Sequence, residues 1–289
     1  MNAELVQLIQ TYFAKVMESE TAAGLIAQTE AIYKRFTSTI RVRDKFGMDP
    51  VLVQLLRPVF EFLYKDWWRV EIKDIRNVPV KGPAIVVANH SGMLPYDAAM
   101  INMGIYSEHP KHRNVRFLVA DFIGNFPVLS RFIERAGGVK ASPENAKALV
   151  KKGEIVCVFP EGTRGIGKLY ADRYKLQDFG KGGVVRVAME TGVPVIPCAV
   201  IGAEDIHPIL YKFDDIGRKF GLPFLPVTPT FPLFGLVGLI PFPSKWTIKF
   251  GRPIRYKKCK KSNILHLTED LRMSVQSLID SEISPEHRR

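Results

Sequence analysis

Residues 84–97 read AIVVANHSGMLPYD, and this stretch decides the fold class. Its first five residues form a short, uncharged run rich in β-branched side chains, which is typical of a strand buried on both faces. The run stops at Asn89-His90, and Leu94-Pro95 precedes the start of a helical pattern. A buried strand that ends in polar residues and leads into a helix is the repeating unit of an α/β sheet.

The same pattern recurs along the rest of the chain. Short apolar runs that end at polar clusters predict strands at 115–120, 155–159, 193–201 and 246–250. Helices are expected at 183–191 and 264–283, and after the capping pair Ser142-Pro143. We therefore expect an α/β fold with a largely parallel central sheet flanked by helices, whose ligands gather at the carboxyl ends of the strands.

The first 69 residues have a different pattern from the rest of the chain. Apolar residues recur at helical spacing over 3–17 and 22–41, and residues 50–70 are apolar on nearly every side except at a few basic positions. Pro58 is expected to kink this last helix or divide it, and the Trp67-Trp68 pair at its end suits a lipid headgroup region. We therefore expect two parts, an N-terminal membrane-facing helical segment at 1–69 and an α/β domain at 70–289; a helical cap packed on the core is the open alternative.

The charge of the chain needs an anionic partner. The formal net charge is +12, and aromatic residues (18 Phe, 9 Tyr, 3 Trp) cluster near basic ones, which favours an anionic membrane surface. No nucleic-acid recognition motif accompanies the charge, so nucleic-acid binding is not expected. The basic run Lys257-Lys258-Cys259-Lys260-Lys261 is a candidate for contact with an anionic leaflet, with a solvated loop as the alternative.

Other features concern the compartment and the membrane. The three cysteines form no pairing pattern, which fits a reducing compartment, and residues 1–10 lack the basic start of a secretory signal. The uncharged stretch 221–243 contains six prolines, so we expect an apolar loop there instead of a membrane-spanning helix. Such a loop could cover a tunnel, dip into one leaflet or lie buried in the core.

Two polar motifs follow strands and carry the candidate chemistry. His90 is followed seven positions later by Asp97, which we expect in the first turn of the next helix, where its carboxylate can orient the imidazole as a general base. The second motif is Phe159-Pro-Glu-Gly-Thr-Arg164, in which the Gly-Thr-Arg turn can hold an anion. Because both motifs leave parallel strands, we expect His90, Asp97, Glu161 and Arg164 to meet at one edge of the sheet.

Metal binding and phosphate binding are two other possible uses of these residues. None of the six histidines forms a cluster with metal-ligand spacing, so no metal is expected. Residues 162–169 nearly match a phosphate-binding loop, but Leu169 stands where a Mg²⁺-binding hydroxyl is required. Nucleotide hydrolysis is therefore not the preferred interpretation.

The two motifs resemble those of the lysophospholipid and glycerolipid acyltransferases, the family of 1-acylglycerol-3-phosphate acyltransferase-like enzymes. In that family the first motif is Asn-His-x4-Asp and the third is Phe-Pro-Glu-Gly-Thr-Arg. The resemblance covers roughly residues 70–255 and includes Gly192-Val-Pro-Val-Ile-Pro197, which is similar to the family's fourth motif.

The chain departs from the family pattern in two places. Six residues instead of four separate His90 from Asp97, and the form His-Ser-Gly-x-Leu-Pro-x-Asp resembles the branch similar to monoacylglycerol and diacylglycerol acyltransferases. The second motif lacks the family's arginine, which is associated with the acceptor's phosphate. The nearest cation is Lys140, which could share the task with Arg164.

The resemblance implies direct acyl transfer from acyl-CoA or an acyl carrier protein to a hydroxyl of a lysophospholipid or glyceride. His90 would be the general base, with Asp97 holding its ring, and no cofactor is implied. The acceptor would be positioned by Glu161, Gly162, Thr163, Arg164 and Lys140. The enzyme would be a peripheral or monotopic membrane protein at the cytoplasmic face, and its oligomeric state stays open. The alternatives are a non-catalytic lipid-binding protein that keeps the fold and a thioester hydrolase.

Overall fold

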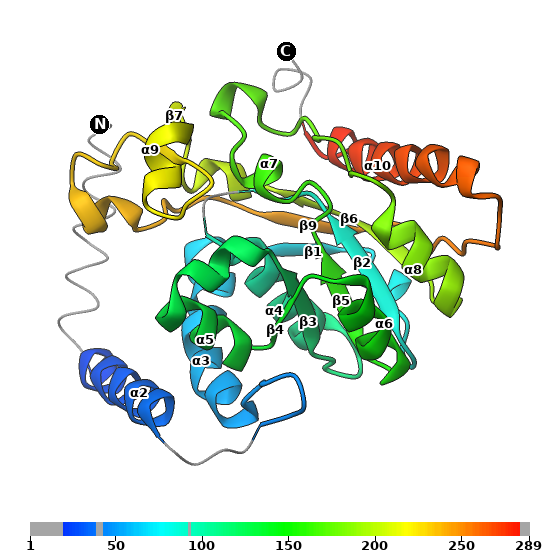
Figure 1. Ribbon diagram of the computed structural model, residues 1–289. Coiled ribbons are helices and arrows are strands. Elements are labelled where there is room, and N and C mark those ends of the chain that lie inside the picture. The colour runs from blue at the N-terminus through cyan, green and yellow to red at the C-terminus, as the bar shows by residue number, and fades with distance from the viewer. Residues whose placement is uncertain (1–19, 39–42, 92–93, 284–289) are drawn as a thin grey trace.

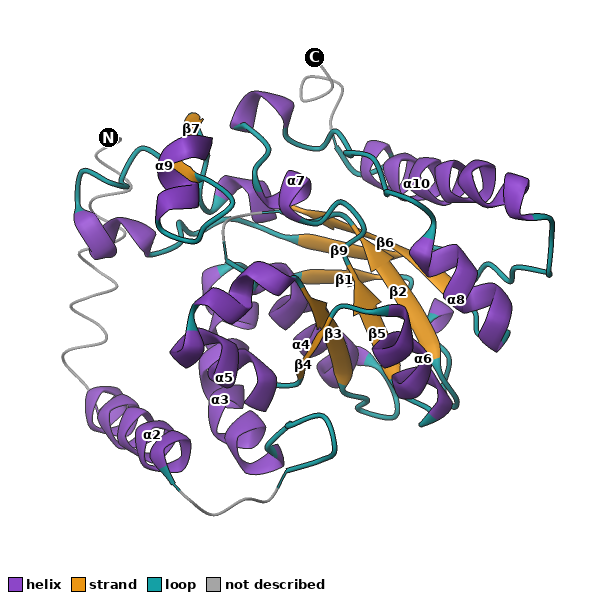
Figure 2. Ribbon diagram, viewed as in Figure 1, coloured by secondary structure: helices purple, strands orange, loops and turns teal. Residues whose placement is uncertain are grey.

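The computed structural model describes residues 20–38, 43–91 and 94–283, so the helical stripe expected at 3–17 lies outside the described residues. A seven-stranded sheet forms the central layer, in the order β1-β9-β6-β2-β5-β3-β4, with helices packed around it (Figures 1 and 2). The strands are β1 Glu71–Lys73, β2 Ala84–Ala88, β3 Val115–Val119, β4 Gly138–Lys140, β5 Ile155–Val158, β6 Val195–Ile201 and β9 Thr247–Phe250. The pairings between neighbouring strands are parallel, except that β6 and β9 are antiparallel. The expected α/β fold with a largely parallel sheet is confirmed.

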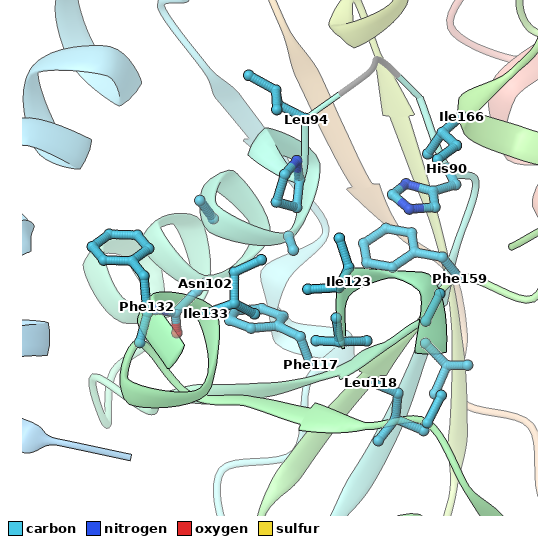
Figure 3. Close-up of a pocket in the computed structure, with 18 of the residues that line it drawn as sticks. His90, Leu94, Asn102, Phe117, Leu118, Ile123, Phe132, Ile133, Phe159 and Ile166 are labelled. Atoms are coloured by element: carbon cyan, nitrogen blue, oxygen red, sulfur yellow. The ribbon is translucent and has the colours of Figure 1, made fainter. Parts of the chain in front are cut away.

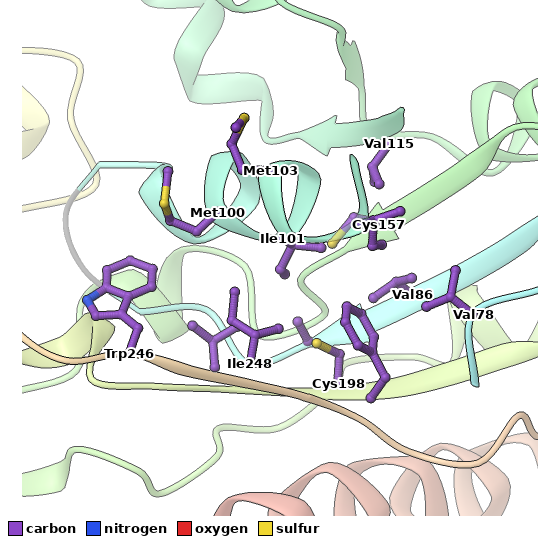
Figure 4. Close-up of a cluster of buried hydrophobic side chains, with 14 of the residues drawn as sticks. Val78, Val86, Met100, Ile101, Met103, Val115, Cys157, Cys198, Trp246 and Ile248 are labelled. Atoms are coloured by element: carbon purple, nitrogen blue, oxygen red, sulfur yellow. The ribbon is translucent and has the colours of Figure 1, made fainter. Parts of the chain in front are cut away.

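The central strand β2 is buried on both faces, as its apolar sequence requires. Val86 points into a cluster that also contains Met100, Cys157, Cys198 and Ile248 (Figure 4). Its neighbours Ile85 and Val87 belong to a second cluster, which packs against helices of the opposite face. Burial raises the pKa of both cysteine thiols, so they are inert apolar side chains of the core.

Helices follow the strands as the sequence indicated. The α-helices of the domain are α4 Tyr96–Glu108, α5 Pro127–Arg135, α6 Pro143–Lys151, α7 Thr163–Ile166, α8 Gly183–Thr191, α9 Asp214–Lys219 and α10 Ile264–Asp280. The Ser142 hydroxyl accepts the backbone N–H of Asn145 at the start of α6, and α8 ends at Gly192 with φ of +70°. Segment 202–246 leaves the sheet between β6 and β9 and carries the two-stranded pair β7 Tyr211–Phe213 and β8 Leu225–Val227.

The N-terminal segment packs on the domain through α2 Glu20–Thr37 and α3 Pro50–Phe62. The helix α3 contains Pro58 and is not divided there, so of the two expected effects, a kink or a division, the division is absent. A π-helical turn, Leu63–Trp67, follows it. Trp68 does not lie at a surface: it is fully buried, stacks on Trp246 at 4.7 Å between ring centroids, and donates its indole N–H to the carbonyl of Phe242. The interpretation of the tryptophan pair as headgroup anchors is therefore wrong for Trp68. In the described part of the chain, no helix is both long and apolar enough to cross a membrane.

A buried ion cluster fastens α2 and α3 to the domain. Asp49 caps α3 and is fully buried between Arg35 and Arg135, with N–O distances of 2.9 and 2.6 Å. Although burial acts in the opposite direction, hydrogen bonds from these two arginines lower the pKa of Asp49 to about 2. The sequence did not reveal this cluster, because its members come from three separate elements.

We expect Asp49→Asn to destabilise the fold by about 3 kcal/mol at neutral pH, because Arg135 would be left buried without its counter-charge. A carboxylate with a lowered folded pKa contributes stability above its unfolded pKa, and that contribution, roughly 2–3 kcal/mol here, is lost as the pH falls through its folded pKa. The difference between wild type and variant should therefore shrink between about pH 4 and pH 2. Urea denaturation at several pH values checks this, with exposed Asp215→Asn as the control; a difference that does not depend on pH would contradict the assignment.

Candidate functional site

His90 and Asp97 form a hydrogen-bonded pair at the carboxyl end of β2. Nδ1 of His90 lies 2.6 Å from Oδ2 of Asp97, which is in the first turn of α4, as expected. The carboxylate is fully buried and also accepts the backbone N–H groups of Ser91 and Ala98. These bonds fix the carboxylate as an acceptor for Nδ1–H, and in that tautomer the lone pair of Nε2 is available to act as a general base.

Two further contacts fix the loop that carries His90. The side chain of Asn89 donates to the carbonyl of Val200 and accepts the N–H of Val200, which extends the pairing of β2 with β6 beyond the last strand residue. The His90 ring stacks on Phe159 with a centroid distance of 4.4 Å. The asparagine of the first motif therefore holds the loop in place, while the phenylalanine of the third motif sets the plane of the imidazole.

Glu161 holds the loop that carries His90 through hydrogen bonds of its carboxylate to backbone N–H groups. Its side chain is fully buried; Oε1 accepts the backbone N–H of His90 at 2.8 Å and Oε2 accepts that of Gln177 at 2.7 Å. The contacts expected between Glu161 and an acceptor are thus not available to its carboxylate. The sequence placed Glu161 correctly at the site, but its role in the structure is to join the two motifs.

Lys168 is a site residue that the sequence reasoning missed. Its ammonium group is buried, 2.8 Å from Glu204 and 3.5 Å from Oε2 of Glu161. Burial alone would lower the pKa of Lys168, but the two carboxylates outweigh it and raise the pKa, while burial raises the pKa of Glu204. Because this lysine is enclosed between carboxylates, it is not free to hold a nucleotide phosphate, which removes the phosphate-loop alternative. Its position in that near-match was the only sequence signal for it.

The turn Gly162-Thr163-Arg164 lies beside His90. Gly162 has φ of +57° and ψ of −139°, a conformation open to glycine and strained for other residues. The Arg164 guanidinium is about half exposed and donates to the carbonyl and the carboxylate of Asp178. Lys140, at the end of β4, is exposed and lies 3.4 Å from the carboxylate of Asp121. Both cations are therefore accessible to solvent, but they are not in contact with His90.

A cavity of about 290 Å³ begins at His90 and runs between α3, α4, β3 and α5. Figure 3 shows His90 and Phe159 at one end and a largely apolar lining beyond them, with Phe117, Phe132 and Ile133 on its walls. Gly162 and Thr163 line the cavity beside His90, whereas Arg57, Tyr106 and Asn114 line its wall near the end of α4. The sequence predicted a ligand site at this edge of the sheet but not the walls of the cavity, because these come from elements far apart in the chain. Among the described residues, no group of His, Cys, Asp and Glu could hold a metal ion.

Comparisons with known proteins agree with this arrangement. A family model described as Acyltransferase matches residues 69–201. An uncharacterised protein of Mycobacterium tuberculosis is 47% identical over 212 residues, which cover 73% of this chain and 59% of the relative. A protein of Mycoplasma pneumoniae named probable 1-acyl-sn-glycerol-3-phosphate acyltransferase is 28% identical over 156 residues, covering 52% of this chain and 56% of the relative. The chain thus spans less than two thirds of the length of these curated relatives.

The fold also resembles a solved structure. The crystal structure of the 1-acyl-sn-glycerophosphate acyltransferase PlsC from Thermotoga maritima matches with a TM-score of 0.51 and 20% sequence identity, over 95% of this chain and 88% of that one. At this level of identity the match concerns the fold, whereas the family model covers both motifs of the site. Residues 69–201 therefore match the Acyltransferase family, as the two motifs indicated.

Proposed function

We propose that this protein transfers a fatty acyl group from a thioester donor, acyl-CoA or an acyl carrier protein, to a hydroxyl of a lysophospholipid or glyceride. The observation that carries the proposal is the His90–Asp97 pair at the end of an apolar cavity. The family match and the name of the Mycoplasma relative support a glycerolipid acceptor.

In the proposed mechanism, Nε2 of His90 takes the proton of the acceptor hydroxyl while Asp97 holds Nδ1–H. The hydroxyl oxygen forms a bond to the thioester carbon, and the carbon–sulfur bond then breaks. The thiolate leaves and takes the proton from the imidazolium, so the base is regenerated. This cycle uses only side chains of the chain and the two substrates, and we propose that no cofactor or metal takes part.

The acceptor is proposed to lie against the Gly162-Thr163-Arg164 turn. Gly162 and Thr163 line the cavity next to His90, and the exposed guanidinium of Arg164 follows directly in sequence. Lys140 adjoins Ala141, another lining residue, so Lys140 and Arg164 are the cations proposed to contact a phosphate on the acceptor. Glu161 acts in this proposal through the loop of His90 and not through contact with the acceptor.

The acyl chain is proposed to occupy the apolar cavity. We expect Ala99→Phe, at a lining position on α4, to shorten the cavity and shift donor preference towards short chains. If about three methylene groups lose their place at ~0.8 kcal/mol each, the ratio of kcat/KM for palmitoyl-CoA over octanoyl-CoA falls roughly 50-fold. Leu265→Phe, which introduces phenylalanine at an exposed position on α10, is the control. An unchanged ratio in Ala99→Phe would place the acyl chain outside this cavity.

Product analysis tests the proposed function. The purified chain is incubated with labelled acyl-CoA and a panel of glycerol-3-phosphate, lysophospholipids, monoacylglycerol and diacylglycerol, and the products are separated by thin-layer chromatography. We expect a labelled ester with at least one acceptor. Labelled free fatty acid alone would favour the thioester hydrolase, and no turnover with retained lipid binding would favour the non-catalytic lipid-binding protein.

The location is part of the proposal as well. Because both substrates carry long acyl chains, we propose that the protein works as a peripheral or monotopic protein on the anionic, cytoplasmic leaflet of a membrane. The net charge of +12 supports an anionic surface as the partner. We also propose that residues 1–69 face the membrane.

A further inference from the structure

Segment 210–240, the apolar segment, gathers much of the exposed apolar surface of the molecule. It contains β7, α9, β8 and the 3-10 turn Gly235–Leu239. Of the sixteen large hydrophobic side chains exposed among the described residues, nine belong to it. They are Leu210, Tyr211, Phe213, Ile216, Phe220, Leu233, Phe234, Val237 and Ile240. A soluble surface seldom concentrates apolar side chains in this way without a partner.

The exposed apolar side chains of this segment belong to a part of the chain that is held in place by hydrogen bonds. Leu233 is 82% exposed and Val237 is 68% exposed, although Thr230 between β8 and the turn donates its hydroxyl to the carbonyl of Gly238. The indole N–H of Trp67 also donates to the carbonyl of Pro241, which anchors the end of the segment to the body of the protein. No charged residue occurs between 220 and 244. The exposed apolar side chains of the segment therefore point to solvent from a backbone that is anchored to the rest of the protein.

The apolar segment borders the candidate active site. At its base, Ile209 and Phe224 pack with Ile166 and Phe122, and the latter two line the cavity that starts at His90. The carbonyl of Gly221 accepts the side-chain N–H of Asn125, which joins the segment to the start of α5. On α5, Val128 is 72% exposed and Leu129 38%, so the apolar surface continues onto a helix that also lines the cavity.

Basic residues accompany these apolar tips. Lys212, Arg218 and Lys219 lie in the segment and Arg131 lies on α5; the acids beside them are Asp214, Asp215 and Glu134, and Asp215 pairs with Arg218. Outward apolar and aromatic side chains with cations beside them match the boundary between lipid chains and anionic headgroups. A protein partner would instead need a shaped groove or polar groups arranged for specific hydrogen bonds.

We propose that the apolar segment, together with Val128 and Leu129, is the surface by which this protein inserts into an anionic lipid bilayer. This inference rests on the proposed function in one respect: it places the cavity that starts at His90 next to the source of its amphiphilic substrates. The basic run at 257–261 is not part of this surface, because Figure 1 shows α10 and the loop before it on the opposite side of the molecule from α9 and β7.

The test measures vesicle binding without substrates, so its result does not depend on enzymatic activity. The purified full chain is sedimented with sucrose-loaded vesicles of phosphatidylcholine, with or without roughly 30% phosphatidylglycerol. We expect strong binding to the anionic vesicles and weak binding to the zwitterionic ones. The double variant Leu233→Glu/Phe234→Glu should lower the partition coefficient about 100-fold, because two apolar side chains no longer enter the bilayer.

A matched control is available on α10, where Leu265 is 61% exposed and Met273 50% exposed. The variant Leu265→Glu/Met273→Glu adds the same charges on the other side of the molecule and should bind as wild type does. The conservative variant Leu233→Trp should bind fully, and its emission should shift to the blue and be quenched by brominated lipid. Circular dichroism checks that each variant is folded.

Several outcomes would overturn the inference. The inference is wrong if the wild type binds neither kind of vesicle. It is also wrong if the Leu233→Glu/Phe234→Glu variant binds vesicles like the wild type. An equal loss of binding in the α10 control would also contradict it, as would a tryptophan at 233 that stays in water. If the double variant instead dissociates a dimer in gel filtration without changing vesicle binding, the occupant is a second copy of the chain and the bilayer proposal is wrong. Failure of the acyl-transfer assay with normal vesicle binding would count against the proposed function alone.

Discussion

Replacing His90 with alanine is expected to lower kcat by about 10²- to 10⁴-fold, the usual contribution of a general base. The imidazole lines the cavity, and among the described residues that line it there is no other histidine. Its 2.6 Å bond to a buried carboxylate fixes the ring at the end of the cavity, and alanine removes the base from this position. The measurement is steady-state formation of labelled ester from acyl-CoA and the acceptor found in the panel.

The control for this prediction is His266→Ala, on α10, whose side chain is 80% exposed. This variant should keep wild-type kcat. Circular dichroism should show that both variants are folded; His90→Ala is expected to unfold at a lower denaturant concentration, because the buried carboxylate of Asp97 loses its partner. An His90→Ala enzyme that keeps wild-type kcat would show that another group, or the substrate itself, accepts the proton.

Replacing Asp97 with asparagine is expected to have the second largest effect, a loss of kcat of about 10²- to 10⁴-fold at neutral pH. Oδ2 of Asp97 accepts from Nδ1 of His90, while Oδ1 accepts the N–H of Ala98 at 2.7 Å. In asparagine one of these positions becomes an NH₂ group. If it faces His90, Nδ1 must become the acceptor, and the proton moves to Nε2, where the base is needed.

The split between kcat and KM distinguishes this role from simple loss of structure. Asp97→Asn should lower kcat while KM for the acyl donor changes little, because the cavity wall keeps its shape. Asp97→Ala, which leaves the imidazole free to adopt either tautomer, should retain more activity than Asp97→Asn. If the order were reversed, Asp97 would act mainly as the cap of α4 and not as the partner of His90.

The sequence predicted the parts of the fold whose pattern is local. The buried strands 84–88 and 155–158 could be predicted because every residue in them is apolar. In the structure their side chains enter the apolar clusters on both faces of the sheet. The short strands β1 and β4 were not expected, because three residues at the ends of the sheet carry too little pattern. The burial of Trp68 depends on its stacking with Trp246, which is far away in the sequence, so no local pattern could predict this burial.

The candidate site divides in the same way. The pairing of His90 with Asp97 could be predicted, because a strand end and the next helix turn are close by construction. The role of Glu161 could not, since it depends on contacts with His90 and Gln177 across the site. Lys168 and Glu204 come together only through the parallel arrangement of β5 and β6 around β2. The cavity is a property of packing between four elements and leaves no trace in any one of them.

A structure of the chain with a non-hydrolysable thioether analogue of palmitoyl-CoA tests the central claim most directly. The account predicts that the acyl chain fills the cavity between α3, α4 and α5. It also predicts that the carbon in the position of the thioester carbonyl lies roughly 4–6 Å from Nε2 of His90, which leaves room for one acceptor oxygen between them. An acyl chain bound outside this cavity, or a reacting carbon separated from His90 by protein atoms, would contradict the account.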